Sequence, residues 1–141
     1  MITPDEVIPL LLAACPSFAF GWETAQIENL DPSEPGGRLH YLDAGDFVRH
    51  IVALKVAEKT EEFPAVFDVI EQLVSEGDPY VKNLGVIGYI EGSQMMTVTS
   101  AGLDPKRDFR PWLRSRSQVW WSRLNRAWDG DTHALMEQDP E

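Results

Sequence analysis

Two histidines and two aspartates lie close together in the sequence and are its best candidates for metal chemistry. They are His40, Asp43, Asp46 and His50. Residues four apart share a helix face, so Asp46 and His50 would lie side by side, and imidazole and carboxylate groups are ligands of divalent metals. The spacing matches no established metal motif, however, and Arg49 would oppose a bound cation. We therefore expect no metal and no cofactor, and interpret the aspartate–histidine pair as electrostatic support for the helix surface.

The sequence offers no clear nucleophile or acid–base pair. Nucleophilic catalysis would need Cys15 or a serine beside a base that a third group holds. Cys15 lies in an apolar run, where a free cysteine is usually a small core residue, and the candidate serines lack a glycine-rich elbow. The carboxylate pairs Asp5-Glu6 and Glu61-Glu62 are typical of solvated first helical turns. We expect a protein that is not an enzyme, with a metal-dependent enzyme built on the two histidines and two aspartates as the least favoured alternative.

A basic and aromatic segment runs from Arg107 to Trp128. Arginines alternate there with Phe109 and four tryptophans, a combination that holds single-stranded nucleic acids. At helical spacing, however, Trp120 and Trp128 would point into the core, and the arginines could pair with acidic residues elsewhere. We expect this segment to close the helical stack and to bind no nucleic acid.

Charge and size narrow the classes of protein. The chain has 141 residues, of which 43% are hydrophobic, enough for one core. It has 12 basic and 23 acidic residues, for a net charge of −11. Nucleic acids and anionic bilayers would repel such a surface, and no segment reaches the ~20 apolar residues of a membrane span. We expect one helical domain over residues 1–129 and a disordered acidic tail over residues 130–141, with neither nucleic acid nor membrane as a partner.

The single cysteine bears on the cellular compartment. Cys15 has no second cysteine to pair with, which favours a reducing compartment. The run that ends at Cys15 is similar to a lipoprotein cleavage box, but a secretory signal needs a positive start and an unbroken apolar stretch. Here Asp5 and Glu6 make the start acidic, and Pro9 interrupts the stretch. We expect a cytoplasmic protein.

Helix punctuation predicts an all-α fold of about seven helices in an antiparallel stack. Thr3 begins a capping box, Ser17 and Thr60 could cap the second and fourth helices, Ser115 could open a second capping box, and Gly77 could end a helix in the left-handed conformation. The expected helices cover residues 4–14, 18–29, 44–58, 60–76, 79–98, 105–113 and 115–128.

Apolar periodicity predicts which residues face outward and which helix is central. In the third helix Phe47 and Ile51 would face the core, while Asp46, Arg49 and His50 would lie on the opposite face. Acidic residues of the fourth helix, including Asp68 and Glu71, would likewise face away from the core. The fifth helix is apolar around its circumference and is expected to be buried, with Gly85, Gly88 and Gly92 kept for close helix contact.

Two resemblances extend this interpretation. The sequence from Asp78 to Lys82, after a helix that ends at Gly77, resembles the turn of a HEAT-type repeat, which implies antiparallel helix pairs over residues 61–92. The segments Tyr41 to His50, Phe67 to Glu71 and Gly88 to Glu91 resemble an uncharacterised family of small bacterial helical proteins, over most of residues 7–128. Such proteins are similar in size and acidity to the immunity proteins of bacterial toxin systems.

We therefore expect an acidic immunity or inhibitor protein that binds a basic toxin domain and blocks it by occlusion. The alternative is a helical scaffold or adaptor module without a toxin partner. The expected partner-binding residues are the acids of the third and fourth helices with two basic neighbours: Asp43, Asp46, Arg49, His50, Glu58, Glu61, Glu62 and Asp68.

Overall fold

The fold is all-α, in a computed structural model that describes residues 1–98 and 102–137. In this part of the chain there are seven helices and no strand, which confirms the predicted fold class. The helices are α1 (Pro4–Ala14), α2 (Ala19–Glu28), α3 (His40–Val56), α4 (Phe63–Glu76), the continuous helix α5 (Pro79–Asn83), η3 (Leu84–Glu91) and α6 (Gly92–Val98), then α7 (Pro105–Asp108) and α8 (Ser115–Trp128). Shorter 3₁₀ turns are η1 (Pro16–Phe18), η2 (Pro35–Gly37), η4 (Arg110–Trp112) and η5 (Ala134–Met136).

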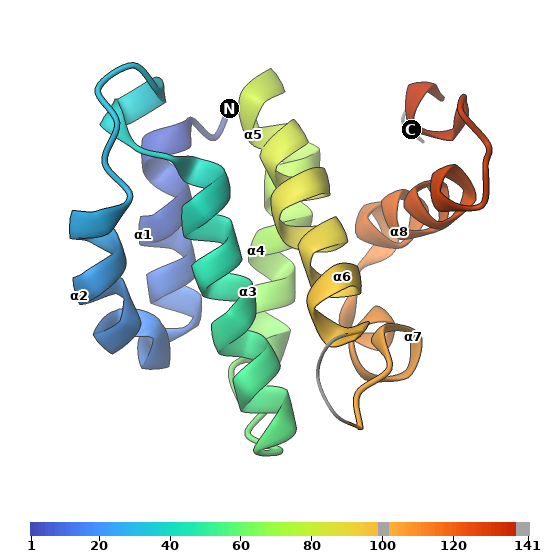
Figure 1. The fold of residues 1–141 in the computed structure, drawn as a ribbon, viewed down its shortest axis with the longest axis horizontal. Coiled ribbons are helices and arrows are strands. Elements are labelled where there is room, and N and C mark those ends of the chain that lie inside the picture. The colour runs from blue at the N-terminus through green and yellow to red at the C-terminus, as the bar shows by residue number, and fades with distance from the viewer. Residues whose placement is uncertain (99–101, 138–141) are drawn as a thin grey trace.

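The core lies where α4 and the continuous α5–η3–α6 helix meet. α4 packs against α1, η3 and α8, while α3 covers η3 and α6, and α2 packs on α3 (Figure 1). Fully buried aromatic residues from α3, α4, η3, α8 and the end of α7 fill the space between the helices: Phe47, Phe63, Phe67, Tyr89, Phe109 and Trp121. α3 thus lies between α2 and the central helices, while α1 packs directly against α4.

The fifth helix runs from residue 79 to residue 98, as the sequence predicts, but its centre is a π-helix. Two of its glycines allow the close contact that we expected. A Cβ atom on Gly85 would lie 2.9 Å from Val74 Cγ1, and one on Gly88 would lie 3.0 Å from the Cβ of Ala44. The same interpretation is wrong for Gly92, where the nearest atom would be 3.5 Å away, an ordinary contact.

Gly77 ends α4, but not in the left-handed conformation that we expected. Its φ and ψ are −68° and 156°, which is extended backbone open to any residue. What requires glycine is the sharp junction between α4 and α5. A Cβ atom at Gly77 would lie 2.5 Å from the carbonyl oxygen of Leu73 and 2.6 Å from Val81 Cγ1.

Several helix starts lack the side-chain cap that the sequence predicts, and at α8 a distant side chain takes its place. α4 begins at Phe63, with no side-chain cap from Thr60. Ser17 does not cap α2; its backbone N–H donates to Glu62 Oε2 at 3.1 Å. The second capping box is also absent, since the first amides of α8 donate to Glu71 of α4. Glu71 is therefore partly buried against α8 and does not face away from the core as predicted.

α3 begins four residues before the predicted start. Its first residue is His40, since Leu39 is the N-cap and its carbonyl accepts the N–H of Asp43 at 3.1 Å. The extra turn brings Asp43 into the helix on its inner side. In α2, the apolar residue Ile27 is 70% exposed.

The last helix buries a different face from the one predicted. Trp121 is fully buried, whereas Trp128, expected in the core, is 60% exposed. After α8, where we expected disorder, residues 131–137 pack back onto the helix. Ala134 is fully buried, and Arg126 pairs with both Asp131 and Glu137 at 2.7 Å. The rest of the predicted tail, residues 138–141, lies outside the described residues.

Over the described ranges, no single helix is long and apolar enough to cross a membrane. Only α1 and the following segment Pro16–Glu28, bent by 109° relative to each other, meet the length and composition criteria as a pair.

Candidate functional site

Asp43 is a buried structural residue and not part of an exposed acidic surface. It is 1% exposed and accepts two hydrogen bonds from Arg38, from Nε and Nη2, each at 2.9 Å. Asn29 Nδ2 donates to the same carboxylate at 3.0 Å. Arg38 also donates to the last carbonyls of α2, those of Ala25 and Gln26. Asp43 therefore joins α2 to α3, and our expectation that it faces a partner is wrong.

Asp46 lies one turn along α3 and is half-buried. Its carboxylate accepts a hydrogen bond from Asn29 Nδ2 at 2.8 Å and pairs with Arg49, whose guanidinium is largely exposed. Together with His50 these residues line a hollow of about 320 Å³ between α2 and α3, whose other walls include Phe18 and Glu28. Three of the eight predicted partner-binding residues thus gather at one hollow.

His50, Ser17 and Glu62 form a hydrogen-bonded chain at the α1–α2 turn. His50 Nε2 lies 2.8 Å from Ser17 Oγ, and Ser17 Oγ donates to Glu62. Burial opposes ionisation of Glu62, but the hydrogen bonds from Ser17 outweigh it and lower the pKa of this carboxyl. Since an ionised carboxylate only accepts hydrogen bonds, the Ser17 proton points to Glu62 and its oxygen accepts from His50.

This order of donors is the reverse of what an activated serine needs. A nucleophilic serine donates its proton to the imidazole that will remove it. Burial lowers the pKa of His50 despite the nearby Glu62 charge, and the ring uses Nε2 as a donor. The geometry therefore holds the α1–α2 turn against the start of α4.

Cys15 lies at the same junction, and its thiol is protonated. Its sulfur is 3.6 Å from Glu62 Oε1 and 3.5 Å from Ser17 Oγ, and the residue is fully buried. Burial, helped by the Glu62 charge, raises the pKa of the Cys15 thiol to about 11. A thiol is a weak nucleophile compared with its thiolate, so this cysteine is suited to packing.

The four residues first considered as metal ligands do not converge on one point, although Asp43 and Asp46 share the amide of Asn29 as a donor. His40 is buried, with Nε2 2.5 Å from the carbonyl oxygen of Pro35, while Asp43 belongs to Arg38 and His50 to Ser17. In the part of the chain that the structure describes, no group of three or more His, Cys, Asp or Glu residues is arranged to hold a metal ion.

The remaining predicted residues lie around the connection between α3 and α4. Glu58 and Glu61 are exposed, and neither forms an ion pair with any described residue. Glu62 is half-buried and bound to Ser17, and Asp68 forms a 2.7 Å ion pair with Arg114 of the basic segment. Asp46 lies ten residues before the end of α3 at Val56, about 15 Å along the helix, and Glu58 follows that end. The eight predicted residues thus do not form one continuous patch.

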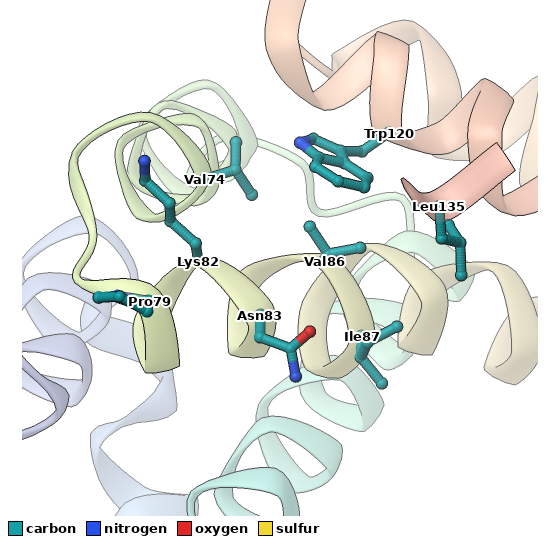
Figure 2. Close-up of a pocket in the computed structure, with 8 residues that line it drawn as sticks. All are labelled: Val74, Pro79, Lys82, Asn83, Val86, Ile87, Trp120 and Leu135. Carbon is teal, nitrogen blue, oxygen red and sulfur yellow. The ribbon is translucent and has the colours of Figure 1, made fainter. Parts of the chain in front are cut away.

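Sequence reasoning missed an apolar groove between the central helix and α8. Figure 2 shows Val86 of η3 facing Trp120 of α8, with Leu135 of the C-terminal segment beside them. The groove has a volume of about 310 Å³, and Lys82 and Asn83 supply its polar edge. We expected Trp120 to be buried in the core, but it is only partly buried and lines this groove.

Comparison with known proteins gives a family but no function. A family model described as a domain of unknown function (DUF7674) matches residues 8–129. No curated protein matches the chain, and no solved structure matches it either.

Proposed function

The chain belongs to the DUF7674 family, and we propose that it is a cytoplasmic immunity or inhibitor protein that binds a basic bacterial toxin domain. The observation that carries this proposal is the net charge of −11 together with the exposed carboxylates of Glu58 and Glu61, which no described cation neutralises. An acidic surface attracts a basic partner over a distance and accelerates its association. Inhibition would follow from occlusion of the toxin's working surface.

The contacts of the potentially reactive groups support binding over catalysis. Cys15 is a buried thiol, Ser17 donates its proton to Glu62, and His40 is bonded to a backbone carbonyl. Each group stabilises a junction between helices. Because these reactive side chains have structural roles, we favour a function that depends on binding through the protein surface.

In this proposal one surface steers the partner and a second surface holds it. The α3–α4 corner with Glu58 and Glu61 supplies unpaired negative charge for steering. The hollow at Asp46, Arg49 and His50 is concave and partly apolar, so a partner side chain could enter it and slow dissociation. The hollow borders α3 and the corner follows the C-terminal end of the same helix, so one partner could contact them together.

Capture of the partner by matched baits tests this function. We expect the wild-type chain, used as bait in lysate of its native cells, to retain a basic protein and to form a defined complex with it. Co-expression of the wild-type chain should reduce the toxicity of that protein. The double variant Glu58→Lys/Glu61→Lys should retain much less of it. The control Glu23→Lys/Glu76→Lys changes the net charge equally at exposed sites on α2 and the far end of α4, and should retain nearly as much. An acidic or non-toxic partner, or equal loss in both variants, would contradict the proposal.

The apolar groove of Figure 2 favours a second candidate, a scaffold or adaptor module. An apolar anchor residue of a partner could fill such a groove whatever the partner's charge. In that case Trp120→Ala would abolish partner capture, while the Glu58→Lys/Glu61→Lys variant would capture normally.

A further inference from the structure

A larger hollow lies between α6, α7 and α8, away from both surfaces of the proposed function. Its volume is about 610 Å³, within the range of roughly 300–1,000 Å³ that is typical of small-molecule sites. The residues that line it are Gln94, Met95, Pro105, Lys106, Trp121, Asn125 and Trp128. No function proposed above uses any of them.

The walls of this hollow are mostly apolar and open to solvent. Met95 is 51% exposed and Trp128 is 60% exposed, while Trp121 beneath them is buried. An indole ring and a thioether that line the same hollow are well suited to packing against an aromatic ring. A ligand that covered these two side chains would remove their apolar surface from water.

Three of the residues that line the hollow, Lys106, Asn125 and Trp121, carry hydrogen-bond donors. Lys106 forms no ion pair with any described residue. Asn125 uses its Oδ1 to accept a hydrogen bond from Gln94 Nε2 at 3.2 Å, which leaves its own Nδ2 as a donor. The buried indole N–H of Trp121 has no acceptor among the described residues, so its positive partial charge is uncompensated beside the hollow.

No carboxylate lines the hollow, although the chain as a whole is strongly acidic. Asp104 is close in sequence, but its Oδ1 accepts the backbone N–H of Lys106 at 2.9 Å. The ammonium group of Lys106 attracts negative charge, and the unpaired donors attract acceptor oxygens. The apolar walls therefore favour an aromatic ligand, and the donors favour one that carries a negative charge.

We propose that this hollow binds a small aromatic carboxylate. The aromatic body packs against Trp128 and Met95, and the carboxylate lies beside Lys106 and the amide nitrogen of Asn125. The site is independent of the proposed toxin binding, since it uses none of the same residues.

Titration with 2-naphthoate tests this site. The chain has five tryptophans, and their indole N–H signals in the ¹⁵N-labelled protein can be assigned by single Trp→Phe variants. We expect saturable shifts of the Trp128 and Trp121 signals, no shift of Trp22, and a Kd on the order of 1 mM or tighter. The uncharged isostere 2-naphthalenemethanol should bind about fivefold more weakly, because it lacks the exposed ion pair between the carboxylate and Lys106.

Matched lysine variants locate the anion. Lys106→Gln should weaken naphthoate binding about fivefold and Trp128→Ala about tenfold, both at exposed positions where folding is unaffected. Lys82→Gln removes a lysine from the groove of Figure 2 and should leave binding unchanged. Absence of a saturable shift, equal binding of the acid and the alcohol, or dependence on Lys82 with shifts at Trp120 would each overturn the proposal.

Discussion

Burial separates the acidic residues of this chain into structural and surface groups. Asp43 is enclosed by Arg38, and Glu71 receives the first amides of α8, whereas Glu58 and Glu61 face solvent. The sequence predicts all of these residues to be exposed because helical periodicity describes only the local face. Arg38 lies in a loop and α8 is 45 residues from Glu71, so the pairing depends on tertiary structure. The exposed corner could be predicted from the sequence, but the buried pairs could not.

Cys15 should react slowly with thiol reagents. Its pKa is raised from an ordinary value near 9 to about 11 by burial, so at pH 8 the folded chain contains about 100-fold less thiolate than an unfolded chain. The rate with a thiol-specific disulfide reagent, measured in buffer and in urea, checks this expectation. Since the folded pKa lies above the unfolded one, ionisation destabilises the fold only as the pH rises above about 9. Comparable rates in the two solutions would show that the thiol is not buried.

Glu58 has a backbone conformation that its side chain disfavours. Its φ is 58°, in the left-handed region just after α3, where a side chain costs roughly 1 kcal/mol or more relative to glycine. We expect Glu58→Gly to raise the free energy of unfolding by about 1 kcal/mol, measured by urea denaturation. Glu58→Ala removes the same charge and keeps a Cβ atom, so it should give no such gain. An equal gain in both variants would assign the effect to charge.

The sequence predicts the positions of the helices better than any other feature of this structure. The prolines and apolar periodicity predict all seven helices, and the boundaries of the fifth agree with the structure at both ends. The π-helix at Leu84–Glu91 was not predicted, because a change from four- to five-residue spacing leaves no composition signal. The side-chain cap expected from Thr60 is absent, and at α8 the carboxylate of Glu71 accepts the first amides in place of the expected Ser115 capping box. Local signals thus predict where helices occur, and tertiary contacts determine how their ends are satisfied.

Two glycine variants test the helix junctions. Gly77→Ala should lower the free energy of unfolding by about 2–3 kcal/mol, because the new Cβ atom meets the Leu73 carbonyl oxygen and Val81. Gly92→Ala adds the same atom within a helix, where the nearest neighbour is 3.5 Å away, and should raise stability by up to about 1 kcal/mol. Urea denaturation of both variants provides the comparison. If Gly77→Ala is neutral, the α4–α5 junction is looser than described.

At the scale of the whole molecule, charge is unevenly distributed. Residues 104–128 carry 7 basic and 2 acidic residues, whereas residues 1–103 carry 5 basic and 16 acidic residues. Part of the basic segment is neutralised internally, as Arg114 pairs with Asp68 and Arg126 with Asp131 and Glu137. The excess negative charge therefore remains on the body formed by the earlier helices, which is the surface that a basic partner would meet first.

The central claim is that this negative charge steers a basic partner to the α3–α4 corner. The most direct measurement is the association rate constant of the captured partner between ~20 and ~200 mM salt, since the Debye length shrinks over this range. We predict a steep fall with salt, and an on-rate about tenfold lower at low salt for Glu58→Lys/Glu61→Lys. The Glu23→Lys/Glu76→Lys control, with the same net charge, should change the on-rate about twofold or less. An on-rate that ignores salt, or falls equally in the two variants, would contradict the account.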